Sequence, residues 1–76
     1  MDATEIVLAA IKEETGVAPS MDTEIRDLFD SLSLVEFGIT LADKISSNTI
    51  FERPEMFTAK TVADLIEVVK LDMNNA

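Results

Sequence analysis

The segment Asp30-Ser31-Leu32 contains the hydroxyl group with the best local setting for chemistry in this sequence. Asp30 precedes a run with helical periodicity, so its carboxylate is predicted to accept hydrogen bonds from the free N–H groups of the first helical turn. Ser31 is then the first helical residue. A hydroxyl at this position lies beside the positive end of the helix dipole, where an added phosphate ester is well tolerated. We therefore predict that Ser31 is accessible and open to modification.

The sequence supplies no partner that would make Ser31 a nucleophilic catalyst. It has no histidine and no cysteine, which excludes an imidazole base, a thiolate nucleophile and a structural zinc site of the usual kind. Asp30 is occupied in capping, and no acidic loop has the spacing of a calcium site. We expect no catalytic residue and no metal site. Ser31 is instead expected to accept a group from another enzyme that brings its own base and metal.

Charge and length narrow the class of protein further. Fifteen acidic and six basic residues give a net charge of −9 over 76 residues, so nucleic acid is not an expected partner. The length suits a single domain over residues 1–76, and 47% hydrophobic residues can form its core. Asp2 and Glu5 stand where a secretory signal carries positive charge, and no apolar run is long enough to span a bilayer. We expect a cytoplasmic monomer.

Apolar residues recur at helical spacing in three segments, over residues 3–15, 31–45 and about 62–73. Thr61 followed by Asp64 forms a capping pair at the start of the last segment. Each segment has one apolar side and one charged side, as an amphipathic helix requires. The predicted buried stripes consist of Ile6, Val7, Ala10 and Ile11 in the first helix, Leu34, Phe37, Leu41 and Ile45 in the second, and Val62, Leu65, Ile66, Val69 and Met73 in the last.

The connection between the first two long helices has no regular pattern. Gly16 is placed to end the first helix in the left-handed conformation, and residues 17–29 follow as a loop. An uncovered loop of this length is unusual. We therefore expect Ile25, Leu28 and Phe29 to pack against the helices.

The connection to the last helix begins with a polar break at residues 46–49 and contains a short helix over about residues 53–57. Pro54 suits the first turn of that helix, and Met56 and Phe57 are expected to face inward. No segment alternates as a strand does. The predicted fold class is all-α, a compact bundle of three longer helices plus one short helix. The methionines expected to fill the core are Met21, Met56 and Met73.

Length, acidity, helix order and the segment Asp30-Ser31-Leu32-Ser33-Leu34-Val35-Glu36 together resemble the acyl carrier protein family over nearly the whole chain. The resemblance implies that Ser31 carries 4′-phosphopantetheine, attached covalently from coenzyme A by a phosphopantetheinyl transferase (holo-carrier synthase), and that Asp30 contacts this enzyme. The arm ends in a thiol that holds acyl intermediates as thioesters. The implied function is delivery of acyl groups to fatty-acid or polyketide-type biosynthetic enzymes in lipid metabolism. Such a carrier is a phosphoprotein and not itself an enzyme.

The resemblance also implies how partners recognise the chain. Acyl-loading and acyl-transferring enzymes of such pathways present basic docking patches to the second long helix and the start of the next. Acidic groups speed and orient the encounter, while a small apolar patch gives affinity without slow release. Leu32, Val35 and Ile39 are expected to be exposed, because other positions form the more regular buried stripe. The implied partner-binding residues are Leu32, Val35, Glu36, Ile39, Asp43, Glu52 and Glu55.

Departures from the usual pattern keep other interpretations open. The connection between Gly16 and Asp30 is several residues shorter than in typical fatty-acid carriers, and Leu28-Phe29 precedes the motif where a glycine is often found. One alternative is an aminoacyl, peptidyl or other specialised carrier protein. From a different class, the alternative is an unmodified acidic helical adaptor that binds a basic partner. Gly38, inside a helix, either leaves room for part of an acyl chain or permits close helix contact.

Overall fold

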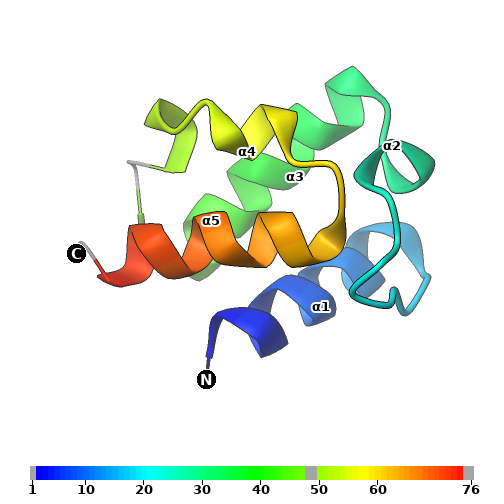
Figure 1. Cartoon of the computed structure of the whole chain (residues 1–76), viewed down its shortest axis with the longest axis horizontal. Helices are drawn as coiled ribbons and strands as arrows, with labels where there is room; N and C mark the ends of the chain where they lie inside the picture. Colours follow the sequence, from blue (N-terminus) through cyan, green and yellow to red (C-terminus); the bar gives the residue numbers. More distant parts are fainter. Residues whose placement is uncertain (1, 48–49, 75–76) are drawn as a thin grey trace.

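In the part of the chain that the structure describes, residues 2–47 and 50–74 of a computed structural model, three longer helices surround the core and shorter helical turns connect them (Figure 1). These residues form no β-strand, only an isolated antiparallel bridge between Glu24 and Thr61. The predicted all-α bundle is therefore confirmed. In chain order the elements are α1 (Ala3–Thr15), α2 (Ile25–Leu28), α3 (Ser31–Lys44), the 3₁₀ helix η1 (Ile50–Glu52), α4 (Glu55–Thr58) and α5 (Val62–Asn74).

A carboxylate and a glycine fix the two ends of α1. Asp2 precedes the helix, and its carboxylate accepts a hydrogen bond of 2.8 Å from the backbone N–H of Glu5. Gly16 ends the helix in the left-handed conformation, with φ of 76°, and its N–H donates to the carbonyl of Lys12 at 2.8 Å. The predicted glycine cap is confirmed. No helix in the described residues is long and apolar enough to cross a lipid bilayer.

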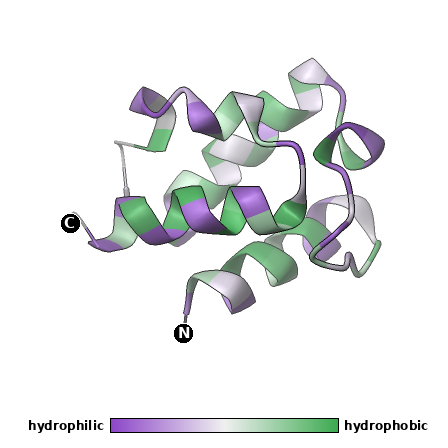
Figure 2. Ribbon diagram, viewed as in Figure 1, coloured by the Kyte–Doolittle hydropathy of each residue, from purple (hydrophilic) through white to green (hydrophobic). Residues whose placement is uncertain are grey.

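The core forms where the apolar sides of α1, α3 and α5 meet, and Figure 2 shows hydrophobic and hydrophilic positions alternating along these helices. Phe37 and Leu41 of α3 are fully buried, and the ring of Phe29 stacks on that of Phe37 with their centroids 4.7 Å apart. Leu34 and Ile45, predicted in the same stripe, are half-buried. The buried hydrophobic residues are Ala3, Ile6, Val7, Ala10, Ile11, Ile25, Phe29, Phe37, Leu41, Ile50, Met56, Val62, Leu65, Ile66, Val68 and Val69.

Backbone hydrogen bonds hold the connection between α1 and α3 against the start of α5. The N–H of Ile25 donates to the carbonyl of Lys60 at 2.8 Å, and the N–H of Val62 donates to the carbonyl of Thr23 at 2.9 Å. Ile25 is buried, so the predicted packing of this loop against the helices is confirmed. The same contacts accompany α2, a single helical turn that the irregular pattern of residues 17–29 did not predict.

Two side chains predicted to face the core are exposed instead. Phe57 is 41% exposed and Met21 is 43% exposed. Neighbouring residues of a helix lie about 100° apart around its axis, so in the short α4 Met56 fills the core and Phe57 does not. The carbonyl of Met21 accepts the N–H of Ala63 at 3.0 Å, which fixes its backbone and leaves its side chain in solvent. The helix α4 also begins later than predicted, with Pro54 as its N-cap.

A buried ion pair ties the segment after α3 to α5. Asp72 is only 3% exposed, a rare position for a carboxylate unless it has partners. The Nε of Arg53 donates to one carboxylate oxygen at 3.0 Å, and the hydroxyl of Ser47 donates to the other. Ser47 belongs to the predicted polar break at residues 46–49, of which residues 48 and 49 lie outside the described residues. The sequence pattern does not separate Asp72 from the exposed acids.

Replacing Asp72 with asparagine should lower the free energy of unfolding by about 3 kcal/mol, because the half-buried guanidinium of Arg53 then lacks its counter-charge. Urea denaturation followed by circular dichroism measures this change. Glu13→Gln is the matched control, since the ion pair between Glu13 and Lys44 has a similar distance of 2.9 Å but lies in contact with solvent. Equal effects of the two substitutions would contradict a structural role for the buried pair.

Candidate functional site

The N-terminus of α3 places Ser31 at the surface. The carboxylate of Asp30 accepts a 2.7 Å hydrogen bond from the backbone N–H of Ser33, while Asp30 itself has extended backbone angles. The helix therefore begins at Ser31, as predicted. Asp30, Ser31 and Leu32 are all exposed. Within residues 2–47 and 50–74, no hydrogen bond engages the Ser31 hydroxyl.

Hydrogen bonding keeps Asp30 ionised. The backbone N–H of Ser33 has the largest effect in lowering the pKa of Asp30 below its usual value, and the Ser33 side chain and the backbone N–H of Leu32 add to it. The carboxylate is thus held in the cap and is not positioned as a free base. The described part of the chain also contains no group of three or more potential metal-ligating side chains. The chemistry that this arrangement supports is acceptance of a group by an accessible hydroxyl.

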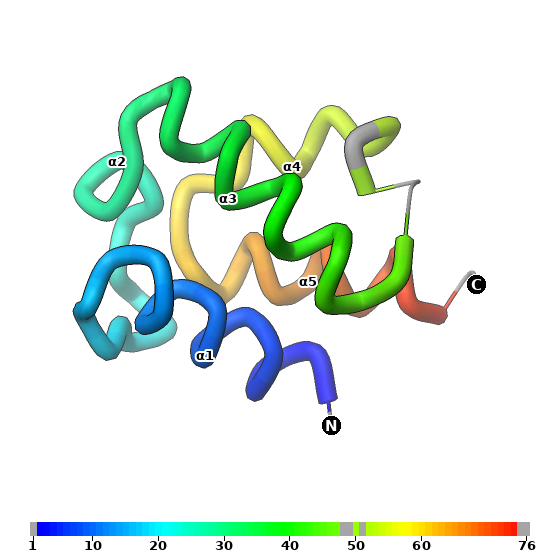
Figure 3. The backbone as a smooth tube through the Cα atoms, turned by 180° about the vertical axis from the view of Figure 1, so that it is seen from behind, coloured from blue at the N-terminus to red at the C-terminus, as the bar shows by residue number. Residues whose placement is uncertain are grey.

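An apolar strip runs along the exposed side of α3. This helix lies in front of α5 in Figure 3. Leu32 is 69% exposed, and Val35 and Ile39 are exposed as well. Their spacing of three and four residues places them on one side of the helix. Glu36 is exposed in the same stretch. The prediction that these apolar side chains lie outside the core is confirmed.

The other acidic residues of the predicted docking surface are also exposed, but they lie farther from Ser31. Asp43 is twelve residues along α3, which corresponds to about 18 Å along the helix axis. Glu52 and Glu55 belong to η1 and α4, two elements that pack against α3. The structure therefore brings all of these residues to the surface of three adjoining elements. The sequence spacing alone does not show that η1 and α4 lie beside α3.

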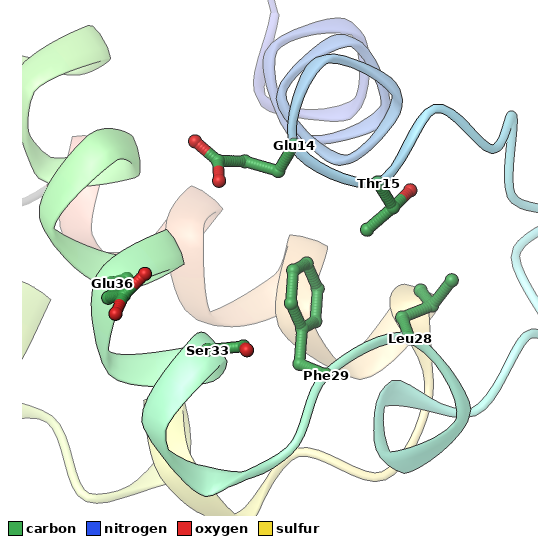
Figure 4. A pocket seen from close by; sticks show the side chains of 6 residues that line it. All are labelled: Glu14, Thr15, Leu28, Phe29, Ser33 and Glu36. Carbon is green, nitrogen blue, oxygen red and sulfur yellow. The ribbon is translucent and has the colours of Figure 1, made fainter.

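A pocket of about 370 Å³, not predicted from the sequence, lies between the end of α1 and the start of α3 (Figure 4). The Glu14 carboxylate accepts the Thr40 hydroxyl at 3.1 Å across the two helices. Gly38 is buried in α3 but does not line this pocket, so the pocket gives no support to a role for Gly38 in holding an acyl chain. The lining residues are Glu14, Thr15, Leu28, Phe29, Ser33 and Glu36.

Comparison with known proteins leaves the family of the chain open. No protein-family model, no curated protein and no solved structure matches it.

The charge on Asp30 should make the stability of α3 dependent on pH. Because the pKa of Asp30 is lowered by folding, its contribution is complete above the usual value of 3.8 and is lost as the pH falls through the lower folded value. Asparagine is a comparable cap without the charge. We expect Asp30→Asn to melt at a lower temperature than the parent at neutral pH, and the difference to disappear at strongly acidic pH. Thermal melts across this range measure it, and a difference that does not vary with pH would contradict the role of the charge.

Proposed function

We propose that this chain is an acyl carrier protein that carries 4′-phosphopantetheine on Ser31. The observation that carries the proposal is the exposed Ser31 hydroxyl, at the first position of a capped helix and without a hydrogen bond inside the described part of the chain. A buried Ser31 hydroxyl would have excluded attachment of this group by another enzyme. The segment from Asp30 to Glu36 resembles the motif of the acyl carrier family, and this resemblance identifies the attached group as phosphopantetheine.

The residues around Ser31 fit a phosphodiester. The first backbone N–H groups of α3 have no partner within the helix, and the positive end of its dipole favours an anion there. Asp30 fixes where this helix begins, so it positions Ser31 without competing for its proton. The attached group supplies a terminal thiol that carries an acyl group as a thioester. The absence of cysteine from the sequence means that no side-chain thiol competes with it.

The modifying enzyme must supply the catalysis. The Ser31 oxygen bonds to the phosphorus of coenzyme A that bears the pantetheine, adenosine 3′,5′-bisphosphate leaves, and the serine proton passes to a base of the transferase. The carrier presents an unhindered hydroxyl and an acidic surface for this enzyme. Its own role is binding and presentation, in the cytoplasm and as a monomer.

The surface of α3 suits brief contacts with basic enzymes. Leu32, Val35 and Ile39 provide a small apolar strip, and Glu36 and Asp43 provide negative charge on the same helix. Charge of this kind raises the rate of encounter, while the small apolar area keeps dissociation fast. The same surface would serve a carrier of aminoacyl, peptidyl or other specialised groups, because the cargo is chosen by the enzyme that loads it.

Incubation with coenzyme A, magnesium and a promiscuous phosphopantetheinyl transferase should raise the mass of the intact chain by one phosphopantetheine group, because the Ser31 hydroxyl is accessible. Mass spectrometry detects the gain. Ser31→Ala should abolish it, whereas Ser33→Ala should retain it, since the main hydrogen bond of the Asp30 cap comes from the backbone N–H of Ser33. An unmodified parent chain would contradict the proposal and favour the acidic adaptor. A gain that persists in Ser31→Ala would contradict the assignment of Ser31 as the attachment site.

Charge reversal on α3 should weaken recognition by the transferase. Glu36→Lys is expected to lower kcat/KM for the modification about tenfold at low salt, with a smaller effect at high salt because ions screen the attraction. Glu5→Lys is the matched control, since Glu5 is equally exposed but lies on α1. Initial rates at several salt concentrations measure both variants. If both lower kcat/KM equally, only net charge matters and the docking surface is not localised on α3.

A further inference from the structure

A second hollow lies between α4 and α5, away from the start of α3. It has a volume of about 400 Å³ and is open to solvent. In Figure 1 α5 and α4 lie nearer the viewer than α3, and in Figure 3, seen from behind, α3 lies in front of α5. None of its lining residues belongs to α3, so the hollow, called here the α4–α5 groove, does not include the apolar strip of α3. Its lining residues are Glu55, Thr58, Ala59, Lys60, Asp64, Glu67, Val68 and Leu71.

The α4–α5 groove has an apolar base. Val68 is buried and Ala59 is half-buried, while Leu71 is 54% exposed. Val68 and Leu71 are three residues apart and share a side of α5. Val68 belongs to the core together with Leu65, Ile66 and Val69, and Leu71 extends this apolar side of α5 into solvent.

Carboxylates border this apolar base. Glu55, Asp64 and Glu67 are exposed, and Lys60 is the cationic side chain that lines the groove. The backbone N–H of Thr61 donates to the Asp64 carboxylate at 3.2 Å and has the largest effect in lowering its pKa, and the Thr61 side chain and the backbone N–H of Lys60, at 3.3 Å, add to it. Three of the lining side chains are carboxylates and one is a cation, so the lining is net negative, although Glu67 also pairs with Lys70 at 3.6 Å beside the groove. A binding segment must offer an apolar side chain with positive charge beside it.

We propose that the α4–α5 groove is a second docking surface, which binds a protein segment that carries an apolar side chain flanked by lysine or arginine. Charge complementarity selects this occupant, since the groove is acidic and the whole chain has a net charge of −9. The same charge opposes a second copy of the chain and an anionic lipid surface. An apolar anchor inserted between two helices with charges at its rim is a common mode of peptide recognition.

The second surface goes beyond the proposed carrier function and does not depend on it. The groove is lined by no residue of α3, so a partner there does not contact Ser31 or the strip of Leu32, Val35 and Ile39. The groove shares Glu55 with the predicted docking surface. One chain could then be held by one protein while another enzyme reaches Ser31. The binding experiment therefore includes Ser31→Ala, which should bind the groove's ligand as the parent does.

The test uses a short synthetic peptide with leucines on one helical face and lysines on the others, added to the isotope-labelled chain and followed by NMR. Saturable shifts are expected at the backbone of residues 58–71. Leu71→Ser should raise Kd about tenfold. The substitution leaves the backbone carbonyl of residue 71 in place, so this carbonyl can still accept the hydrogen bond from the Arg53 guanidinium. A control peptide with serine in place of leucine should cause no saturable shifts.

Matched variants separate this surface from the others. Leu32→Ser removes an exposed leucine from α3 and should leave Kd unchanged. Glu67→Gln should raise Kd more than Asp43→Asn does, since Asp43 lies on α3. If Leu32→Ser weakens binding as much as Leu71→Ser does, the peptide binds on α3 and the proposal is overturned. Absence of saturable binding overturns it as well. Sedimentation that shows a dimer lost in Leu71→Ser assigns the groove to a second copy instead.

Discussion

The stacking of Phe29 on Phe37 is the contact on which the functional end of the bundle depends. Phe29 is the last residue before the cap, and its burial against a fully buried ring of α3 fixes where the loop meets the helix. Asp30 can then turn its carboxylate onto the first turn, and Ser31 emerges at the surface one residue later. Three consecutive residues thus pass from core to cap to solvent. The accessible hydroxyl is a consequence of the aromatic packing beside it.

A small acidic chain folds stably only if its carboxylates stay out of the apolar core or have partners there. Most carboxylates lie at the surface, where water and salt moderate their repulsion. Asp72 is the exception, since it is buried and bound by Arg53 and Ser47. This pair joins the segment after α3 to α5, beside the apolar contacts that Ile50 of η1 and Met56 of α4 make with the core. A buried carboxylate with well-formed partners therefore fixes the position of that segment relative to α5.

The bundle presents two different surfaces because its helices bury only part of their apolar residues. On α3 the side chains of Leu32, Val35 and Ile39 remain outside, next to Ser31. On α5 the exposed Leu71 and the buried Val68 form the base of the α4–α5 groove. Carboxylates border both surfaces. If both bind basic partners, as proposed, one protein could hold the chain at the α4–α5 groove while another reaches Ser31.

The sequence by itself determined α1, α3 and α5, because helical periodicity and capping are local and the residues that produce them are neighbours in the chain. It also determined the Asp30 cap and the exposure of Ser31 and the α3 strip. The turn α2, the exposure of Met21 and Phe57, the buried Asp72 and both pockets were decided by the tertiary structure. Each of these depends on which elements lie side by side. Examples are the hydrogen bond from the N–H of Ile25 to the carbonyl of Lys60 and the ion pair between Arg53 and Asp72. Contacts between residues far apart in the chain leave no periodic signal, so only the packed structure reveals them.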